Sequence, residues 1–252
     1  MNRGPLSARF QELDWRETPL GAISLRRRRD PVSHDDVYEI KLDDDFLMSS
    51  QFTVAEIEVA RLALALVPGT DLDVVVGGLG LGYTAQAVLD SDRVRSLLVV
   101  EALADVIDWH RQALIPAGAA LTADPRCRLV EGDFFALMRD DSTVDQKRDA
   151  IIVDIDHSPR HILHPSHADF YEPRSVRRLA ARLRPGGVFS LWSNDPPDDD
   201  YLGVLGAVFA EVTAEVVSFD NPLQGGRSTN TVYLATTARD AATARESGVA
   251  RE

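Results

Sequence analysis

A glycine-rich stretch follows an apolar run in the middle of the chain. Gly78, Gly80 and Gly82 alternate with single residues directly after the expected strand 73–76. Because glycine carries no side chain, the backbone can turn tightly there and approach a ligand closely. The next expected strand ends at Glu101, where a carboxylate accepts hydrogen bonds from ribose hydroxyls. Together these features predict a nucleoside site, whereas the glycines alone also fit a tight strand-to-helix turn. The stretch lacks the Lys-Ser/Thr pair of a phosphate loop, which argues against a nucleoside triphosphate.

Three further carboxylates come at the ends of later strands. Asp133 follows the expected strand 128–130, and it can accept a hydrogen bond from the exocyclic amine of adenine or cap the helix that follows it. Asp154 and Asp156 follow the next strand. Two carboxylates at this spacing over a cleft can hold a cationic group or take a proton from it. The alternative for this pair is a turn built by Asp and Ser side chains.

Four histidines stand close together after Asp156. His157, His161, His164 and His167 are three or four residues apart, which would place them on one face of a helix as metal ligands. Two prolines interrupt any helix in this segment. We therefore expect a loop over the site and no metal, with His157 in contact with substrate.

Alternating strands and helices must position these side chains. From residue 72 onward five β-α units follow one another, and this order predicts a parallel sheet with helices on both faces. Two late strands, 212–219 and 231–235, are expected to add an antiparallel pair at the edge. The predicted fold class is α/β, with a doubly wound, mostly parallel seven-stranded sheet. In such sheets ligands bind at the carboxyl ends of the strands, where the carboxylates lie.

Two of the helices carry more detailed predictions. Apolar residues recur at helical spacing over 53–67, with Thr53 as the N-cap and Glu56 three residues later, as in a capping box. In the helix after Glu101, Trp109 is expected in the core or beside the adenine, and His110 is expected to be exposed.

The first fifty residues have a different texture. Segments 21–25 and 37–42 alternate apolar and polar residues, which is typical of strands. We therefore expect three parts in the chain. They are an N-terminal β-hairpin region (1–52), a nucleoside-binding catalytic domain (53–237) and a polar C-terminal tail (238–252).

Composition narrows the function classes. The chain has 252 residues, with 27 Lys and Arg against 40 Asp and Glu, so its formal net charge of −13 disfavours nucleic acid as a partner. No stretch is apolar and long enough to span a membrane, and no signal peptide is visible. The single cysteine, Cys127, excludes an internal disulfide and fits a reducing cytoplasm. The acidic balance suits a cationic ligand better.

Several short motifs resemble a known family in their order and spacing. They are VE at 100–101, DPR at 124–126, GD at 132–133, DAIIVD at 149–154, FYE at 170–172 and RPGG at 184–187. Over about residues 15–236 the chain resembles the spermidine synthase (polyamine aminopropyltransferase) family, a branch of the S-adenosylmethionine methyltransferase-like Rossmann fold.

The resemblance implies a role for each matching residue. Gly78 and Gly80 would pass beside the nucleoside and its sulfur-bearing chain, with Glu101 at the ribose and Asp133 at the adenine. Asp154 would be the catalytic carboxylate that deprotonates the attacking amine. The co-substrate would be decarboxylated S-adenosylmethionine. On the substrate side, Asp156 is expected to bind the cationic amine, together with His157 and Tyr171.

The departures from the family pattern lie on the amine side. Gly80 stands where the glycine loop of the family usually carries an aspartate. The second carboxylate of the family is followed directly by proline, whereas here two residues separate Asp156 from Pro159. The family's Asp-Glu-x-x-Tyr-x-Glu stretch is not reproduced, and Glu56 and Glu58 are its only candidates. Asn221 replaces a tyrosine that precedes a proline in a late loop.

Three functions remain open on the sequence. The first is transfer of an aminopropyl group to a polyamine acceptor. The second is methyl transfer from intact S-adenosylmethionine, and the third is nucleoside binding without catalysis. The fold alone does not decide among them. The oligomeric state is also open, and a homodimer paired through the N-terminal β region is one form that the sequence allows.

Overall fold

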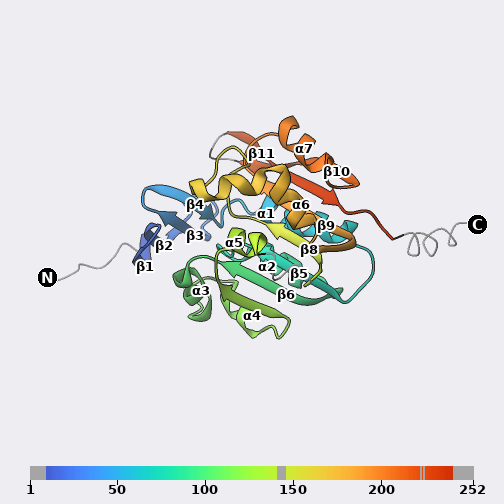
Figure 1. Cartoon of the computed structure of the whole chain (residues 1–252). Helices are drawn as coiled ribbons and strands as arrows, with labels where there is room; N and C mark the ends of the chain where they lie inside the picture. The colour runs from blue at the N-terminus through green and yellow to red at the C-terminus, as the bar shows by residue number, and fades with distance from the viewer. Residues whose placement is uncertain (1–9, 141–145, 222, 224, 241–252) are drawn as a thin grey trace, which may run out of the picture.

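The described part of the chain forms two β-sheets, as the computed structural model shows (Figure 1). The structure describes residues 10–140, 146–221, 223 and 225–240. The predicted tail therefore lies mostly outside the described residues. One sheet has four strands and is built from the N-terminal residues, and the other has seven strands.

The seven-stranded sheet confirms the predicted fold class. Its strands are β5 (Leu72–Gly77), β6 (Val94–Glu101), β7 (Cys127–Glu131), β8 (Arg148–Val153), β9 (Leu183–Ser193), β10 (Glu211–Asn221) and β11 (Gly226–Thr236). Their order in space is β10-β11-β9-β8-β5-β6-β7. Strands β5 to β9 run parallel, and β11 pairs antiparallel with both β9 and β10, as expected for the two late strands.

The central strands are buried on both faces, which explains their unbroken apolar sequences. Val74, Val76 and Ile152 are inaccessible to solvent. Parallel strands need such sequences because crossover helices cover both faces of the sheet. The carboxyl ends of β5, β6, β7 and β8 consequently meet along one edge.

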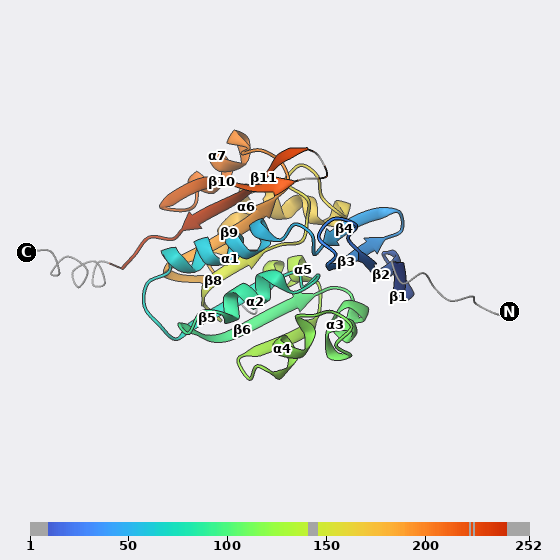
Figure 2. The same ribbon diagram turned by 180° about the vertical axis from the view of Figure 1, so that it is seen from behind.

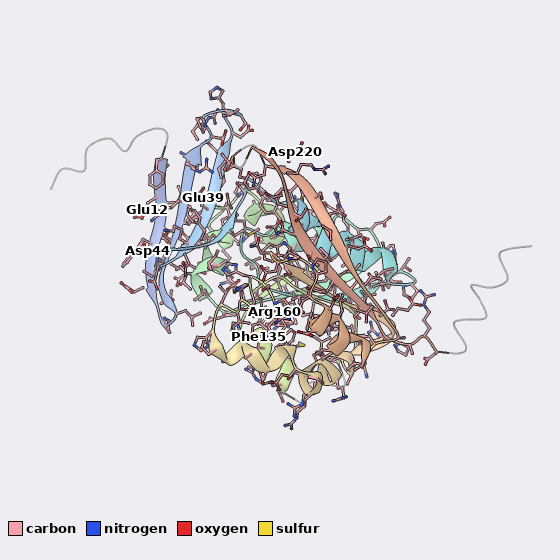
Figure 3. The ribbon with its side chains drawn as sticks, turned by 90° about the horizontal axis from the view of Figure 1, so that it is seen from above. Glu12, Glu39, Asp44, Phe135, Arg160 and Asp220 are labelled. Atoms are coloured by element: carbon pink, nitrogen blue, oxygen red, sulfur yellow. The ribbon has the colours of Figure 1, made fainter. Side chains whose placement is uncertain are left out.

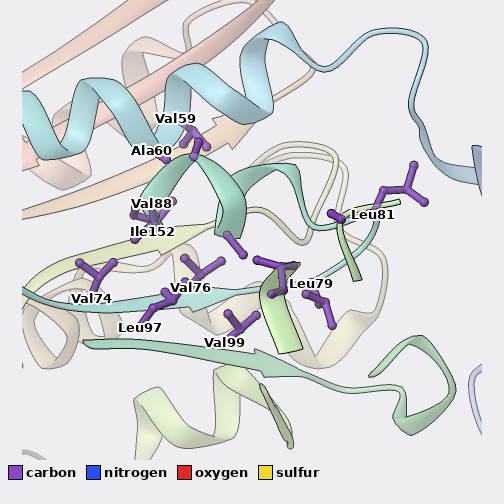
Figure 4. Close-up of a cluster of buried hydrophobic side chains, with 14 of the residues drawn as sticks. Val59, Ala60, Val74, Val76, Leu79, Leu81, Val88, Leu97, Val99 and Ile152 are labelled. Carbon is purple, nitrogen blue, oxygen red and sulfur yellow. The ribbon is translucent and has the colours of Figure 1, made fainter. Parts of the chain in front are cut away.

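Helices cover both faces of this sheet, as Figures 1 and 2 show from opposite sides. One face packs against α1 (Val54–Leu66), α2 (Tyr83–Leu89), α3 (Ala104–Arg111) and α4 (Gly118–Ala123). The other packs against α5 (Phe134–Arg139), the 3-10 helix η2 (Pro165–Tyr171), α6 (Pro173–Ala180) and α7 (Asp199–Gly206). Figure 4 shows the first of these interfaces, where Val59 and Ala60 of α1 meet Val88 of α2 above Val74 and Val76. Among the described residues, no helix has the length and apolar character needed to cross a membrane.

The four-stranded sheet stands at the edge where the parallel strands end (Figure 3). Its strands are β1 (Phe10–Thr18), β2 (Gly21–Arg29), β3 (Asp36–Leu42) and β4 (Asp45–Ser49), all antiparallel. The predicted strands 21–25 and 37–42 are confirmed in β2 and β3. The sequence predicts no separate strand over β1, because its residues are partly exposed and mostly polar. Ile23, Leu25 and Ile40 are buried and join the core of the larger sheet.

The predicted capping box at the start of α1 is wrong. Thr53 occupies the N-cap position, but its side chain makes no capping hydrogen bond. Its backbone torsions, φ −124° and ψ 8°, lie outside the extended region that N-cap residues usually adopt. Glu56 is left free to turn inward, and only 9% of its surface is exposed.

Candidate active site

A cavity of about 860 Å³ lies between the four-stranded sheet and the carboxyl ends of the parallel strands. This volume falls within the range of about 300–1,000 Å³ that is typical of small-molecule sites. Apolar side chains of the N-terminal sheet form one wall, among them Ile40, Leu47 and Met48. The opposite wall consists of the residues that follow β5, β6, β7 and β8. The predicted location of the ligand site at this edge of the sheet therefore coincides with a real cavity.

The glycine loop divides into residues that border the cavity and one that does not. Gly78 and Gly80 line it, whereas Gly82 is not among the lining residues. Gly78 has φ +92°, and a Cβ there would lie 2.2 Å from the carbonyl oxygen of Asp154. Only glycine fits this close approach of β5 to β8.

Gly82 has a packing role in place of the predicted ligand contact. It precedes α2 with φ +89°, and a Cβ there would lie 2.7 Å from Leu121 and 2.8 Å from His110. The bare backbone of Gly82 therefore makes room for the protein's own side chains.

His110, expected to be exposed, is fully buried beneath the glycine loop. Its Nε2 lies 2.9 Å from the carbonyl oxygen of Gly80. Burial lowers the pKa of His110, so the ring is neutral and donates this hydrogen bond from Nε2. Its neighbour Trp109 is also fully buried, as expected for a core residue, and donates from Nε1 to Asp14 of β1 at 2.7 Å.

Glu101 ends β6 and faces the glycine loop across the cavity edge. Its Oε2 accepts a hydrogen bond from the backbone N–H of Leu79, and its Oε1 accepts one from Leu103, both at 2.9 Å. Burial raises the pKa of Glu101, and these backbone donors oppose that rise. The carboxylate is thus fixed between the loop and the start of α3, on the cavity wall.

Asp133 caps the helix that follows it, which is one of the two roles that the sequence left open. Its side chain accepts a hydrogen bond from the backbone N–H of Ala136 at 2.9 Å and so caps α5. Arg139, in the last turn of the same helix, lies 3.6 Å from its other oxygen. Asp133 also lines the cavity, next to Gly132. A capped carboxylate retains lone pairs, so capping does not exclude a contact with ligand.

Asp154 lies on the cavity wall directly after β8. Its Oδ2 accepts a hydrogen bond from the hydroxyl of Thr84 on α2 at 2.6 Å. Burial raises the pKa of Asp154, and the bond from Thr84 opposes the rise only in part. A carboxylate in this state is well suited to accept a proton from a bound cation.

Asp156, two residues later, does not face the cavity. It is 1% exposed, and both of its oxygens accept hydrogen bonds from protein groups. Oδ1 accepts from the backbone N–H of Leu163 and pairs with Nδ1 of His167, each at 2.8 Å. Oδ2 accepts from the hydroxyl of Tyr171 at 2.7 Å. In this structure Asp156 anchors the loop after β8, and the expected contact with the substrate cation is replaced by these bonds.

Tyr171, like Asp156, is buried in the protein interior. It is 8% exposed, does not appear on the cavity wall, and donates its hydroxyl hydrogen to Asp156. Burial raises its pKa well above the ordinary value, so the hydroxyl remains a donor. The sequence could not reveal this, because the pairing joins the loop to η2 across fifteen residues.

The segment after β8 borders the cavity as predicted, but it is a loop only as far as His164, because residues 165–171 form the 3-10 helix η2. Three of its histidines line the cavity. They are His157, His164 and His167, and His167 stacks on Phe135 with ring centroids 4.0 Å apart. The fourth, His161, instead pairs with Asp195 at 2.7 Å, away from the cavity. Within the described part of the chain, no three His, Cys, Asp or Glu residues are grouped so that they could hold a metal ion.

Glu56 is a cavity residue that the capping interpretation had placed elsewhere. It lines the cavity near Asp154, and burial together with the charge of Asp154 raises its pKa from 4.5 to about 8. A signal for this position was present in the helical spacing. Glu56 shares its face of α1 with the buried residues Val59, Ala60 and Ala63, so a side chain there must point inward.

A family model for the spermine/spermidine synthase domain matches residues 58–201, more than half of the chain. The chain therefore belongs to the spermine/spermidine synthase family.

A curated relative supports the same family. Polyamine aminopropyltransferase 2 of Pseudomonas aeruginosa is 30% identical over 150 residues, which cover 56% of this chain and 40% of the relative. The chain thus matches less than half of that protein's length.

Solved structures share the fold. A spermidine synthase in complex with the transition-state analogue AdoDATO has a TM-score of 0.70 at 18% identity, covering 91% of this chain and 74% of the other. Spermidine synthase from Thermotoga maritima gives a TM-score of 0.69 at 18% identity, with the same coverage. A probable spermidine synthase from Corynebacterium glutamicum gives 0.60 at 20% identity, covering 92% and 81%.

Proposed function

We propose that this chain transfers an aminopropyl group from decarboxylated S-adenosylmethionine to an amine acceptor, as its family membership suggests. In this proposal the nucleoside lies along Gly78 and Gly80, with its ribose at Glu101 and its adenine near Asp133. The sulfonium and the acceptor amine meet at Asp154. His157 is proposed to contact the acceptor.

The charge of the cavity wall is the observation that carries this proposal. Among the described residues that line the cavity, none is lysine or arginine, whereas Glu56 and Asp154 stand together beyond the glycine loop. Intact S-adenosylmethionine would bring its own carboxylate toward these acids, and like charges in close contact disfavour binding. The decarboxylated donor carries only cationic groups on that chain. The wall therefore favours the decarboxylated form.

The chemistry is a displacement at carbon. The neutral amine nitrogen attacks the methylene carbon beside the sulfonium, a C–N bond forms, the C–S bond breaks, and methylthioadenosine leaves. An alkyl amine has a pKa near 10.4, so only about one in 2,500 is neutral at pH 7. Asp154 takes the proton from the ammonium and passes it to solvent. Holding the amine in line with the sulfonium supplies the rest of the acceleration.

A product assay tests the proposal. Purified protein is incubated with decarboxylated S-adenosylmethionine and putrescine, spermidine or cadaverine, and the products are identified by mass. We expect one acceptor to gain a single aminopropyl group, with methylthioadenosine formed in equal amount. A methylated amine formed from intact S-adenosylmethionine would replace the proposal with methyl transfer. Tight binding of methylthioadenosine without turnover of any amine would replace it with nucleoside binding alone.

A further inference from the structure

Glu56 is a buried acidic group of the cavity that the displacement mechanism leaves without a task. It lies in the first turn of α1, is 9% exposed, and lines the cavity together with Asp154. Among the described residues, its carboxyl group receives a hydrogen bond only from its own backbone N–H. The residue precedes the segment 58–201 that the family model matches.

Thr84 connects the two acids. Its Oγ1 lies 2.6 Å from Oδ2 of Asp154 and 3.0 Å from the backbone carbonyl oxygen of Glu56. Thr84 is 4% exposed, so this connection is held inside the packed contact between α1 and α2. The first turn of α1 is thereby fixed beside the carboxyl end of β8, and the two acids cannot move apart freely.

The groups around Glu56 provide no cation to balance it. Asp154 faces it from the end of β8, and Tyr83 of α2 is close enough to feel its charge. Burial raises the pKa of Tyr83, which therefore remains a neutral phenol near pH 7. The histidines that line the cavity are His157, His164 and His167, and the described lining contains no lysine or arginine. Two buried acids without a counter-charge share a proton, because ionising both is unfavourable.

We propose that Glu56 is the cation-binding partner of Asp154, and that a cationic amine binds here by exchanging with the proton that Glu56 carries in the free enzyme. The exchange balances simply. The carboxyl proton of Glu56 leaves to solvent, and the resulting carboxylate pairs with the incoming ammonium. Glu56 then fulfils the role that Asp156 cannot fulfil, since Asp156 is buried against its own loop. The inference rests on the proposed function of the same cavity and adds the group that selects a cationic substrate.

The proton balance near neutral pH supports this exchange. The pKa of Glu56 is raised to about 8, first by burial and then by the charge of Asp154. Because pH 7 lies below that value, most Glu56 carboxyl groups carry the proton at neutral pH. An ammonium in the cavity lowers the pKa of Glu56 again, because it adds an opposite charge where only like charge was present.

Calorimetric titration of the intact protein measures the exchange. Methylthioadenosine and decarboxylated S-adenosylmethionine are titrated at pH 7 in two buffers that differ in ionisation enthalpy, so that the difference in heat counts the protons released. We expect close to one proton released for each decarboxylated donor bound, and none for methylthioadenosine, which has no cationic group.

Two variants make the test specific. Glu56→Gln keeps the shape of the side chain and removes its proton, so we expect it to release no proton and to bind the donor at least tenfold more weakly, with unchanged affinity for methylthioadenosine. Glu58→Gln is the matched control, because Glu58 lies on the same helix, pairs with Arg61 at 3.4 Å and does not line the cavity. It should behave like the wild type.

The outcomes separate this inference from the proposed function. Donor binding without proton release, or release that persists in Glu56→Gln, overturns the role of Glu56 and leaves aminopropyl transfer standing. Failure of both ligands to bind overturns the proposed function, and the inference falls with it. If Glu56→Gln does not fold, the wild type alone decides. Release that declines from pH 7 to pH 9 supports the exchange, and release that is constant over this range contradicts it.

Discussion

The two ends of the cavity differ in how their acids are satisfied. At the end proposed for the nucleoside, Glu101 accepts one backbone N–H on each oxygen, both at 2.9 Å. At the end proposed for the amine, Asp154 accepts one hydroxyl, from Thr84, and Glu56 has no donor from any other described residue. The first end is built before its ligand arrives. The second has two buried acids and no lysine or arginine among its described lining residues, which fits the cationic amine that we propose for it.

The largest effect is expected from neutralising Asp154, at the end of the cavity proposed for the amine. Asp154→Asn removes the proton acceptor while keeping the shape of the side chain. We expect it to lower kcat by about 10²-fold or more, which is the usual contribution of a positioned acid or base. Affinity for methylthioadenosine, measured by calorimetry, should not change. Wild-type turnover in the variant would show that another group accepts the proton.

The corresponding change at the nucleoside end should act on binding. In Glu101→Gln, one of the two backbone donors meets an amide NH₂ where it had an oxygen. Because hydrogen bonds to charged groups contribute about 1.5–3 kcal/mol, we expect affinity for methylthioadenosine to fall by roughly 10- to 100-fold. Glu215→Gln, on the exposed side of β10, is the control. Unchanged affinity in Glu101→Gln would mean that the ribose lies elsewhere.

Asp156 sharpens the comparison because it is only two residues from Asp154. Its oxygens bind Leu163, His167 and Tyr171 in the interior, so Asp156→Asn should act mainly on stability. We expect the free energy of unfolding to fall by about 1–3 kcal/mol, the usual cost of leaving a buried polar group unsatisfied. Denaturant titration measures this. If the variant keeps its stability but loses turnover, Asp156 takes part in catalysis and its role is not mainly structural.

Stability should also depend on pH, through the carboxyl group of Glu56. The pKa of Glu56 is raised from 4.5 to about 8 in the folded chain. The folded state therefore binds more protons than the unfolded state between these values. This contribution to stability is fully present below pH 4.5 and is lost as pH rises to about 8. Melting temperatures from pH 5 to 8 should fall more steeply for the wild type than for Glu56→Gln, and parallel curves would contradict the raised pKa.

The features that the sequence predicted correctly are local. The apolar run before Gly78 marks β5, and the position of Glu101 at the end of the next strand follows from the same alternation of elements. Both depend on residues that are neighbours in the chain, so periodicity and strand ends suffice to locate them.

The missed features depend on packing between distant segments. Thr84 contacts both Glu56 and Asp154, and Asp154 lies seventy residues after Thr84 in the chain. His110 is buried because the glycine loop folds over it, and Gly82 is bare for the same contact. The spacing of Glu56 along α1 already indicated an inward position. By contrast, His110 looks exposed and Gly82 looks like a ligand contact when only their own segments are considered.

Discrimination between the two forms of the donor tests the acidic end of the cavity most directly. Dissociation constants for decarboxylated and intact S-adenosylmethionine are measured side by side on the wild-type protein at pH 7. Because the intact form brings a carboxylate toward Glu56 and Asp154, we expect the decarboxylated form to bind at least about tenfold more tightly. Equal or tighter binding of intact S-adenosylmethionine would contradict the assignment of this end to a cationic amine.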